Sequence, residues 1–184
     1  MPLLFIKLNQ YMKPEIEKLV PFILKWEGKY SDLDGTPTMM GVTLPTYTYY
    51  KKLKKEKEPT VNDLRGLSME EWTDILRTLF WDRWRASDIL DGPVCYLLVD
   101  WLWNSGNRAI KIPQGLLGVS PDGIVGNKTI SALNSRGPQF FDDLYTAREE
   151  YLRSIATGSR AKFLRGWLNR IESLRDTFRA GAVS

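Results

Sequence analysis

Glu27 is the residue in this chain whose type and position first suggest chemistry. It follows an apolar stripe in which Ile23 and Leu24 recur at helical spacing, so its carboxyl group continues the buried side of a helix. The partial negative charge of a helix C-terminus and burial beside Trp26 both favour the protonated form of this group. A carboxyl group that stays protonated near neutral pH is suited to the general acid step of glycoside cleavage. The alternative is a structural glutamate that caps the helix or pairs with an arginine.

A second candidate is a polar stripe in the most apolar segment of the chain. Tyr96, Asp100 and Asn104 lie four residues apart, which places them on one face of a helix. This spacing is typical of a buried hydrogen-bond network that orients neighbouring helices. The same stripe could instead line the floor of the cleft that Glu27 enters, and all three side chains would then contact a substrate.

The composition limits the chemistry that is open to this chain. Its 184 residues fit one domain, with room for a small appended subdomain, and they include no histidine. Serine–histidine and cysteine–histidine catalysis and histidine-ligated metals are therefore excluded. The single cysteine, Cys95, lies in an apolar run and is predicted to be a small buried residue. Acid–base groups must come from Asp, Glu, Lys or Tyr, and we expect no metal and no organic cofactor.

Charge and hydropathy bear on partners and location. The net charge of +4 is mild, and the lysines clustered at residues 51–57 are typical of a solvated helix end. Nucleic-acid binding is not expected, because aromatic residues do not interleave with those lysines.

The apolar run at residues 3–6 is too short for a signal peptide, and no segment is long enough to span a membrane. We therefore expect synthesis in the cytoplasm and no membrane insertion. Any export would use another route or a leader that this sequence lacks.

Nearly all periodic segments are helical, which predicts an all-α fold with at most one short β-hairpin. Pro21 is expected to kink the first helix or to begin a second one, and Gly28 to end it as a left-handed cap. Ser68 to Glu71 have the form of a capping box. The predicted helices are residues 13–27, 44–57, from 69 onward, 93–104, 128–134, and 139–178 with an interruption near 157–159, while residues 29–43 form a hairpin or an irregular loop.

The residues that follow Glu27 resemble a known family. Glu27-Gly28-x-Tyr30, then Asp34-Gly35-x-x-Thr38-x-x-Gly41-Val42-Thr43, is similar to the signature of glycoside hydrolase family 108. These are lysozyme-like N-acetylmuramidases, some of which are called secretion activator proteins. Further segments resemble the family in its own order, and together the motifs span about residues 20 to 172. These segments are Phe80-Trp81, residues 99–106, residues 117–129 and the closing motif Phe163-x-x-Gly166-Trp167-x-Asn169-Arg170. Residues 117–129 resemble the opening of the family's peptidoglycan-binding-like part.

The resemblance implies a lysozyme-like catalytic part at residues 1–106 and a helical, peptidoglycan-binding-like part at residues 107–184, packed as one unit. It implies that Glu27 is the catalytic acid and that Thr38 holds the attacking water, with either Asp32 or Asp34 as the base. Tyr30 would contact a sugar or pack within the hairpin. The implied partner is the glycan strand of peptidoglycan, cut between N-acetylmuramic acid and N-acetylglucosamine in the bacterial cell wall. The sequence leaves the oligomeric state open.

Two classes of function follow from these residues. The first is a peptidoglycan hydrolase, for which a carboxyl separation of about 6.5–9.5 Å would indicate inversion and about 5–5.5 Å retention. Lytic transglycosylation is a close variant, because it also uses one glutamate. The second is a non-catalytic wall-binding or secretion accessory protein that keeps the fold. It is favoured by Lys29, which stands where the family has a second glycine, and by a shortened loop at residues 31–35.

Overall fold

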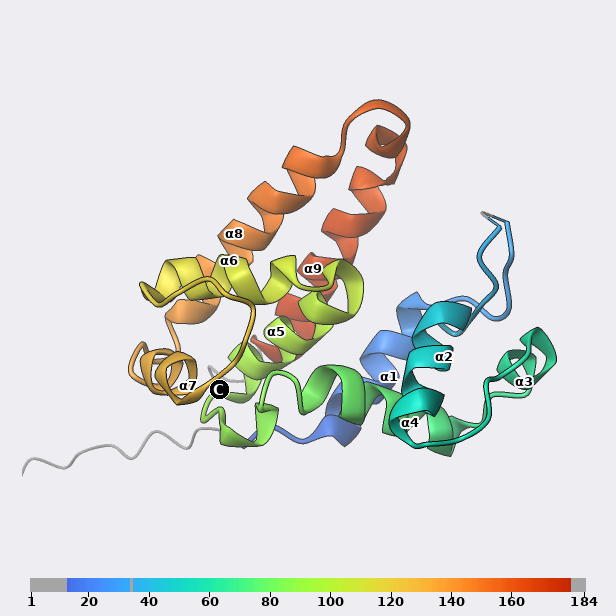
Figure 1. Ribbon diagram of the computed structural model, residues 1–184. Helices are drawn as coiled ribbons and strands as arrows, with labels where there is room; N and C mark the ends of the chain where they lie inside the picture. The colour runs from blue at the N-terminus through green and yellow to red at the C-terminus, as the bar shows by residue number, and fades with distance from the viewer. Residues whose placement is uncertain (1–12, 34, 180–184) are drawn as a thin grey trace, which may run out of the picture.

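The computed structural model describes residues 13–33 and 35–179, which form a helical fold with one small β-hairpin (Figure 1). The all-α prediction is thus confirmed. Asp34 and the apolar run at residues 3–6 lie outside the described residues. Within the described part of the chain, no helix is long and apolar enough to cross a membrane.

Helix α1 (Ile16–Trp26) carries Glu27 as the first residue after its last turn. Pro21 lies inside this one helix, so of the two alternatives expected there, a kink or the start of a second helix, the second is wrong. Glu27 itself has an extended backbone, with φ −95° and ψ 136°, and the chain leaves the helix without a left-handed residue. The left-handed cap predicted at Gly28 is therefore also wrong. Ile16, Leu19, Phe22 and Ile23 form the buried side of the helix.

The predicted hairpin is present after α1. Strand β1 (Thr38–Met39) pairs antiparallel with β2 (Val42–Thr43), and an isolated bridge between Ser31 and Thr38 extends the pairing. The two turn residues, Met40 and Gly41, have φ values of 48° and 79°. Two successive left-handed residues are typical of the tight turn whose twist matches the flanking strands.

Short helices follow the hairpin: α2 (Leu44–Leu53), α3 (Val61–Arg65) and α4 (Met69–Leu76), then the π-helical turn η1 (Arg77–Trp81) and the 3₁₀ turn η2 (Ala86–Asp88). A complete capping box occurs at Thr60, with Asp63 as its partner. At Ser68 only half of the predicted box forms. The Ser68 hydroxyl accepts from the Glu71 backbone, but the Glu71 carboxylate instead accepts from the Tyr47 hydroxyl at 2.8 Å.

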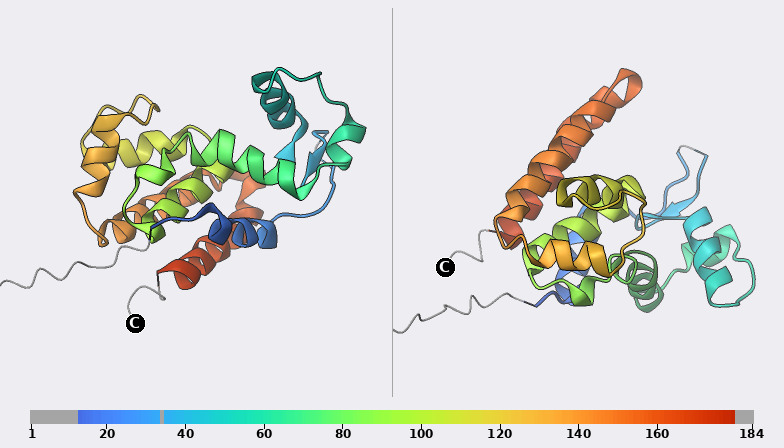
Figure 2. Two further views of the ribbon diagram at one scale, coloured as in Figure 1. Left: turned by 90° about the horizontal axis from the view of Figure 1, so that it is seen from below. Right: turned by 60° about the vertical axis from the view of Figure 1, so that its left-hand side comes forward.

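Helix α5 (Gly92–Ser105) is the centre of the fold, and its residues 92–102 are all buried. Helices α1, α6 (Arg108–Leu117), α8 (Phe140–Ile155) and α9 (Leu164–Phe178) contact it. The remaining elements are α7 (Asn127–Asn134) and the 3₁₀ turn η3 (Gly158–Phe163), which joins α8 to α9 at the predicted interruption. Helices α8 and α9 form a long pair that projects from the molecule (Figure 2).

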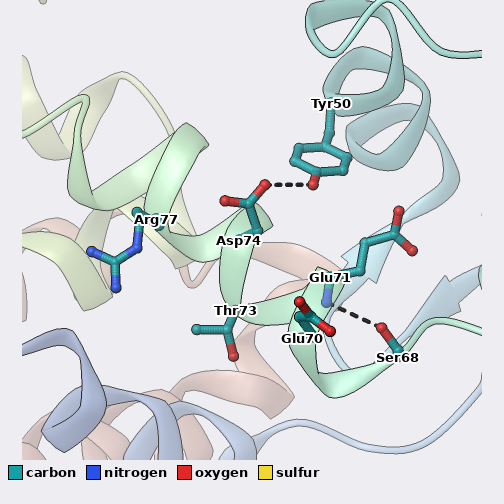
Figure 3. Close-up of a pocket in the computed structure, with 7 residues that line it drawn as sticks. All are labelled: Tyr50, Ser68, Glu70, Glu71, Thr73, Asp74 and Arg77. Atoms are coloured by element: carbon teal, nitrogen blue, oxygen red, sulfur yellow. Dashed lines mark hydrogen bonds between the residues drawn. The ribbon is translucent and has the colours of Figure 1, made fainter.

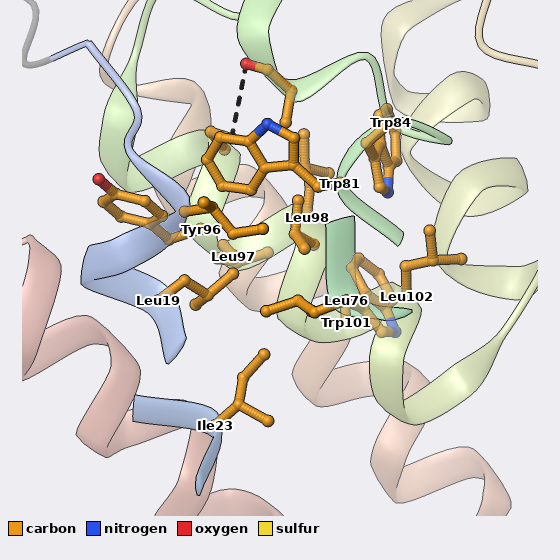
Figure 4. Close-up of a cluster of buried hydrophobic side chains, with 14 of the residues drawn as sticks. Leu19, Ile23, Leu76, Trp81, Trp84, Tyr96, Leu97, Leu98, Trp101 and Leu102 are labelled. Atoms are coloured by element: carbon orange, nitrogen blue, oxygen red, sulfur yellow. Dashed lines mark hydrogen bonds between the residues drawn. The ribbon is translucent and has the colours of Figure 1, made fainter. Parts of the chain in front are cut away.

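The core combines α1, α5 and the segment after α4. Leu19 and Ile23 of α1 face the side chains of α5, while Trp81 and Trp84 close the other side (Figure 4). Because α5 is enclosed by elements from both ends of the chain, its polar residues can meet side chains that are far away in sequence. This arrangement brings the side chains of the candidate site together.

Candidate functional site

The carboxylate of Glu27 is held by two donors from distant helices. Its Oε1 accepts a hydrogen bond from Trp103 Nε1 of α5 at 2.9 Å and from Arg170 Nη1 of α9 at 2.8 Å. The side chain of Glu27 is 17% exposed, so it is largely, though not wholly, removed from water. The arginine pair that the sequence left open as an alternative is therefore present. Both donors bind the same oxygen of the carboxyl group.

The hairpin turn lies directly against the same carboxyl group. A Cβ atom built at Gly41 would lie 2.7 Å from Glu27 Cδ and 2.7 Å from Oε2. Such distances are not compatible with a side chain, so this position needs glycine for close approach as well as for its positive φ. Trp72 also holds the turn, because its Nε1 donates to the Met40 carbonyl at 2.9 Å.

Trp103 is oriented by an aromatic cluster. Its ring centroid lies 5.3 Å from that of Trp72 and 4.8 Å from that of Phe80, both in tilted arrangements. Phe80 belongs to the π-helical turn η1, a type of irregularity that often occurs at functional sites. The cluster thus joins the hairpin anchor Trp72 to the indole that hydrogen-bonds Glu27.

Arg170 is in turn held by Asp100, which is fully buried in α5. The Arg170 Nη2 donates to Asp100 Oδ1 at 2.7 Å, and Arg148 Nη2 of α8 donates to Asp100 Oδ2 at 2.7 Å. Burial alone would raise the pKa of Asp100, but the two arginines outweigh it and hold that pKa below its ordinary value. Burial similarly opposes the charge of Arg170, yet Asp100 and Glu27 raise its pKa.

Two of the three residues in the predicted polar stripe have no exposed surface that a substrate could contact. Tyr96 is fully buried, and its hydroxyl accepts from the Glu15 backbone at 3.0 Å. Asp100 is fully buried between its arginines. The substrate-binding roles predicted for both are wrong, because the helix turns them into the core, where they orient other elements. Asn104 is exposed at the end of α5, where its Nδ2 donates to the Asp100 carbonyl at 2.7 Å, and its substrate-binding role stays a prediction.

The other candidates follow Glu27 in the chain: Tyr30 and Asp32 precede the hairpin, and Thr38 begins β1. Asp32 is exposed and accepts a long 3.5 Å contact from the Tyr30 hydroxyl, while Thr38 donates to the Thr36 carbonyl at 3.0 Å. The guanidinium carbon of Arg65 lies 4.1 Å from the Tyr30 ring centroid, so one face of that ring is covered. The catalytic roles of Asp32 and Thr38 and the sugar contact of Tyr30 stay predictions. Asp34, the other candidate base, lies outside the described residues.

Sequence reasoning missed the partners of Glu27. Arg170 stands in the closing motif, 143 positions from Glu27, and that motif was the available signal for it. Trp103 lies three positions after Asp100 on the same helix, which places it beside the polar stripe. No local pattern marks Arg148. Gly41 stands in the family signature, but the signature does not show that this glycine approaches Glu27.

A separate hollow of about 490 Å³ lies between α2 and α4 (Figure 3). The Tyr50 hydroxyl donates to Asp74 at 2.6 Å, and Lys54 pairs with the same carboxylate at 2.6 Å. Burial, followed by the hydrogen bond to Glu71, raises the pKa of the nearby Tyr47 to about 12. These paired groups fasten α2 to α4.

Among the residues that the structure describes, no group of three His, Cys, Asp or Glu side chains is arranged to hold a metal ion.

Comparison with known proteins gives three findings. The family model described as glycosyl hydrolase 108 matches residues 20–106, and one described as a predicted peptidoglycan domain matches residues 108–172. The solved structure of Brucella abortus SagA is similar to this chain with a TM-score of 0.78 and 26% sequence identity, over 92% of this chain and 96% of that one. No curated protein sequence matches significantly.

Proposed function

We propose that this chain, which belongs to glycosyl hydrolase family 108, cleaves the glycan strand of peptidoglycan with Glu27 as the general acid. Its two family matches make it a peptidoglycan-related, lysozyme-like protein, and its expected place of action is the bacterial cell wall. The finer proposal concerns the bond between N-acetylmuramic acid and N-acetylglucosamine. It rests on the arrangement of donors around the Glu27 carboxyl group.

The supporting observation is that both hydrogen bonds to Glu27 end on Oε1. Among the described residues, Oε2 receives no hydrogen bond and lies next to the hairpin turn at Gly41. In this proposal the catalytic proton is carried on Oε2, where no other donor competes with it, and passes to the glycosidic oxygen that leaves. Once the proton has left, Trp103 and Arg170 already stand where the new carboxylate charge develops. Donors fixed in advance at such a position stabilise the transition state without further reorganisation.

The hairpin would supply the second half of the reaction. In this proposal Asp32 or Asp34 is ionised and activates a water that Thr38 holds, on the opposite face of the sugar ring. Support comes from the connection within the hairpin, because Thr38 belongs to β1 and the turn that follows β1 contacts Glu27. Tyr30 and Asn104 are proposed to contact the sugars beside the cleaved bond.

We further propose that residues 1–106 are the catalytic part and residues 107–184 the wall-binding part, packed as one unit. Their contact at the site supports this arrangement. Arg148 and Arg170 belong to the second part, and both pair with Asp100 of the first. The second part would then complete the site of the first as well as bind the wall.

One observation favours the accessory-protein alternative. The ion pair between Glu27 and Arg170, at 2.8 Å, stabilises the ionised carboxylate, which cannot donate a proton. If that form dominates when peptidoglycan is bound, the protein would bind the wall without cutting it. The same pair can assist catalysis if substrate binding promotes protonation at Oε2.

Digestion of purified peptidoglycan by the wild type and by Glu27→Gln separates these functions. General acid catalysis contributes about 10²–10⁴-fold, so Glu27→Gln is expected to lose at least that factor while its thermal unfolding stays close to wild type. Glu17→Gln, an exposed substitution on the same helix, is the matched control and should retain full activity. Mass analysis of the new ends distinguishes reducing ends from anhydro sugars. Wall binding without new ends in the wild type would refute the hydrolase proposal in favour of the accessory protein.

A further inference from the structure

We propose that a cavity beside the Asp100 ion pairs binds a carboxylate group. The cavity has a volume of about 100 Å³ and lies between the end of α5 and the facing sides of α8 and α9. Helices α8 and α9 run side by side at this point (Figures 1 and 2). Its lining includes Asn104, Ser105, Arg148, Ile155, Trp167 and Arg170. A volume of this size has room for a small carboxylate or for several waters.

Arg148 is the reason to expect an anion there. This side chain is 2% exposed and uses Nη2 to bind Asp100. Its Nε and Nη1 are buried and have no hydrogen-bond partner among the described residues. Together they carry three N–H bonds of a group that is always charged. Buried donors of this kind are normally satisfied, and carboxylate is the acceptor that guanidinium groups bind best.

The charge of the surrounding cluster also depends on Glu27. Arg148, Arg170, Asp100 and Glu27 form one chain of ion pairs, which is neutral when both carboxylates are ionised. Protonation of Glu27 leaves one net positive charge on this chain. A carboxylate in the cavity would neutralise that charge, so its binding and the protonated form of the proposed acid stabilise each other.

Two sources could supply the carboxylate: the peptide carried by peptidoglycan, or a free small acid. The first source rests on the proposed hydrolase function, because it ties occupancy of the cavity to the substrate. Binding of a free acid does not depend on that function. The experiment therefore tests binding first, without turnover.

The probe is sodium acetate, which replaces sodium chloride at constant ionic strength. Nuclear magnetic resonance of the Arg148 Nε–H group should show a saturable shift in the wild type. Ile155→Trp places an indole at the cavity lining and is expected to abolish the saturation, whereas Ile124→Trp, the same change at an exposed site, should leave it unchanged. Glu27→Gln imitates the protonated acid and should tighten acetate binding by roughly fivefold to tenfold.

If Ile155→Trp does not fold, the wild-type titration alone still tests the proposal. A shift that does not saturate, or one that persists in a folded Ile155→Trp variant, would show that the cavity holds water only and would overturn the proposal. An unchanged affinity in Glu27→Gln would overturn the link to the proposed acid.

Kinetics then identifies the source of the carboxylate. If the peptide of peptidoglycan occupies the cavity, acetate should raise KM for intact peptidoglycan but not for glycan strands freed of their peptides. If a free acid is the ligand, acetate should change the kinetics of both substrates equally. Saturable acetate binding by a wild type that digests neither substrate would refute the hydrolase and leave the carboxylate site in place.

Discussion

Gly41→Ala is the sharpest test of the contact between the hairpin turn and the proposed acid. An alanine at φ 79° adopts a left-handed backbone that costs about 1–2 kcal/mol. Its Cβ would also lie 2.7 Å from Glu27 Cδ. Carbon atoms normally approach to about 3.5–4.0 Å, so the carboxyl group must move by roughly 1 Å. A displacement of that size in a catalytic group can lower the rate by about 10²-fold.

Gly35→Ala is the matched control for Gly41→Ala. Gly35 lies in the neighbouring loop between Ser31 and Thr38, with φ 72°, and a Cβ built there would meet nothing within 4 Å. Gly35→Ala should lose about 1–2 kcal/mol, which corresponds to a fall in melting temperature of about 2–8 °C for a chain of this size. Gly41→Ala should lose at least as much, because its Cβ also displaces Glu27. Only Gly41→Ala should also lose about 10²-fold in kcat, measured as new ends released from purified peptidoglycan.

The comparison of the two variants can refute the reasoning. Equal activities of the two folded variants would mean that the position of the Glu27 carboxyl group does not limit the reaction. Loss of activity in Gly35→Ala would assign the effect to the hairpin backbone instead of to the Glu27 contact.

The remaining predictions concern the groups behind the site. Trp103→Phe keeps the ring but removes one donor to Glu27, and kcat should fall by about 10- to 100-fold, the equivalent of a hydrogen bond to a charged group. Asp100→Asn leaves two buried arginines without their anion and should cost about 3–5 kcal/mol in thermal or denaturant unfolding. The folded state lowers the pKa of Asp100. The contribution of ionised Asp100 to the stability of the protein is therefore complete above about pH 4 and is lost as pH falls through the folded-state pKa. The melting temperature of Asp100→Asn should therefore change less than that of the wild type between about pH 5 and pH 2. Tyr50→Phe, in the separate hollow, should cost about 0.5–1.5 kcal/mol and leave kcat unchanged.

The sequence predicted the parts of the fold that depend on local patterns. Apolar spacing located α5 and the two terminal helices, and glycine at 158 marked the break between them. The two left-handed residues of the hairpin turn were not singled out, although the hairpin itself was expected. Helices α3 and α6 were missed, since five residues are too few for a periodic signal and α6 contains Pro113. The π-helical turn η1 has no sequence signature of its own.

Of the residues that meet at the site, the sequence correctly placed only Glu27. Glu27 was recognisable because an acidic residue at the end of an apolar stripe is a local anomaly. The polar stripe was also recognisable, but its direction was not. Whether Asp100 faces a cleft or the core depends on Arg148 and Arg170, which lie 48 and 70 positions away. Periodicity describes one helix at a time and does not say which other helix approaches each face.

The site takes its side chains from both segments that match a family model, because Asp100 depends on distant arginines. A catalytic part that ended near residue 106 would keep Glu27 and Asp100 but would lack both guanidinium groups that pair with Asp100. Removal of the partners of a buried carboxylate is costly, because the charge then stays in a medium of low dielectric constant. The second match, at residues 108–172, contains Arg148 in its interior and Arg170 near its end. The boundary between the matches therefore divides the sequence, whereas the site needs side chains from both sides of it.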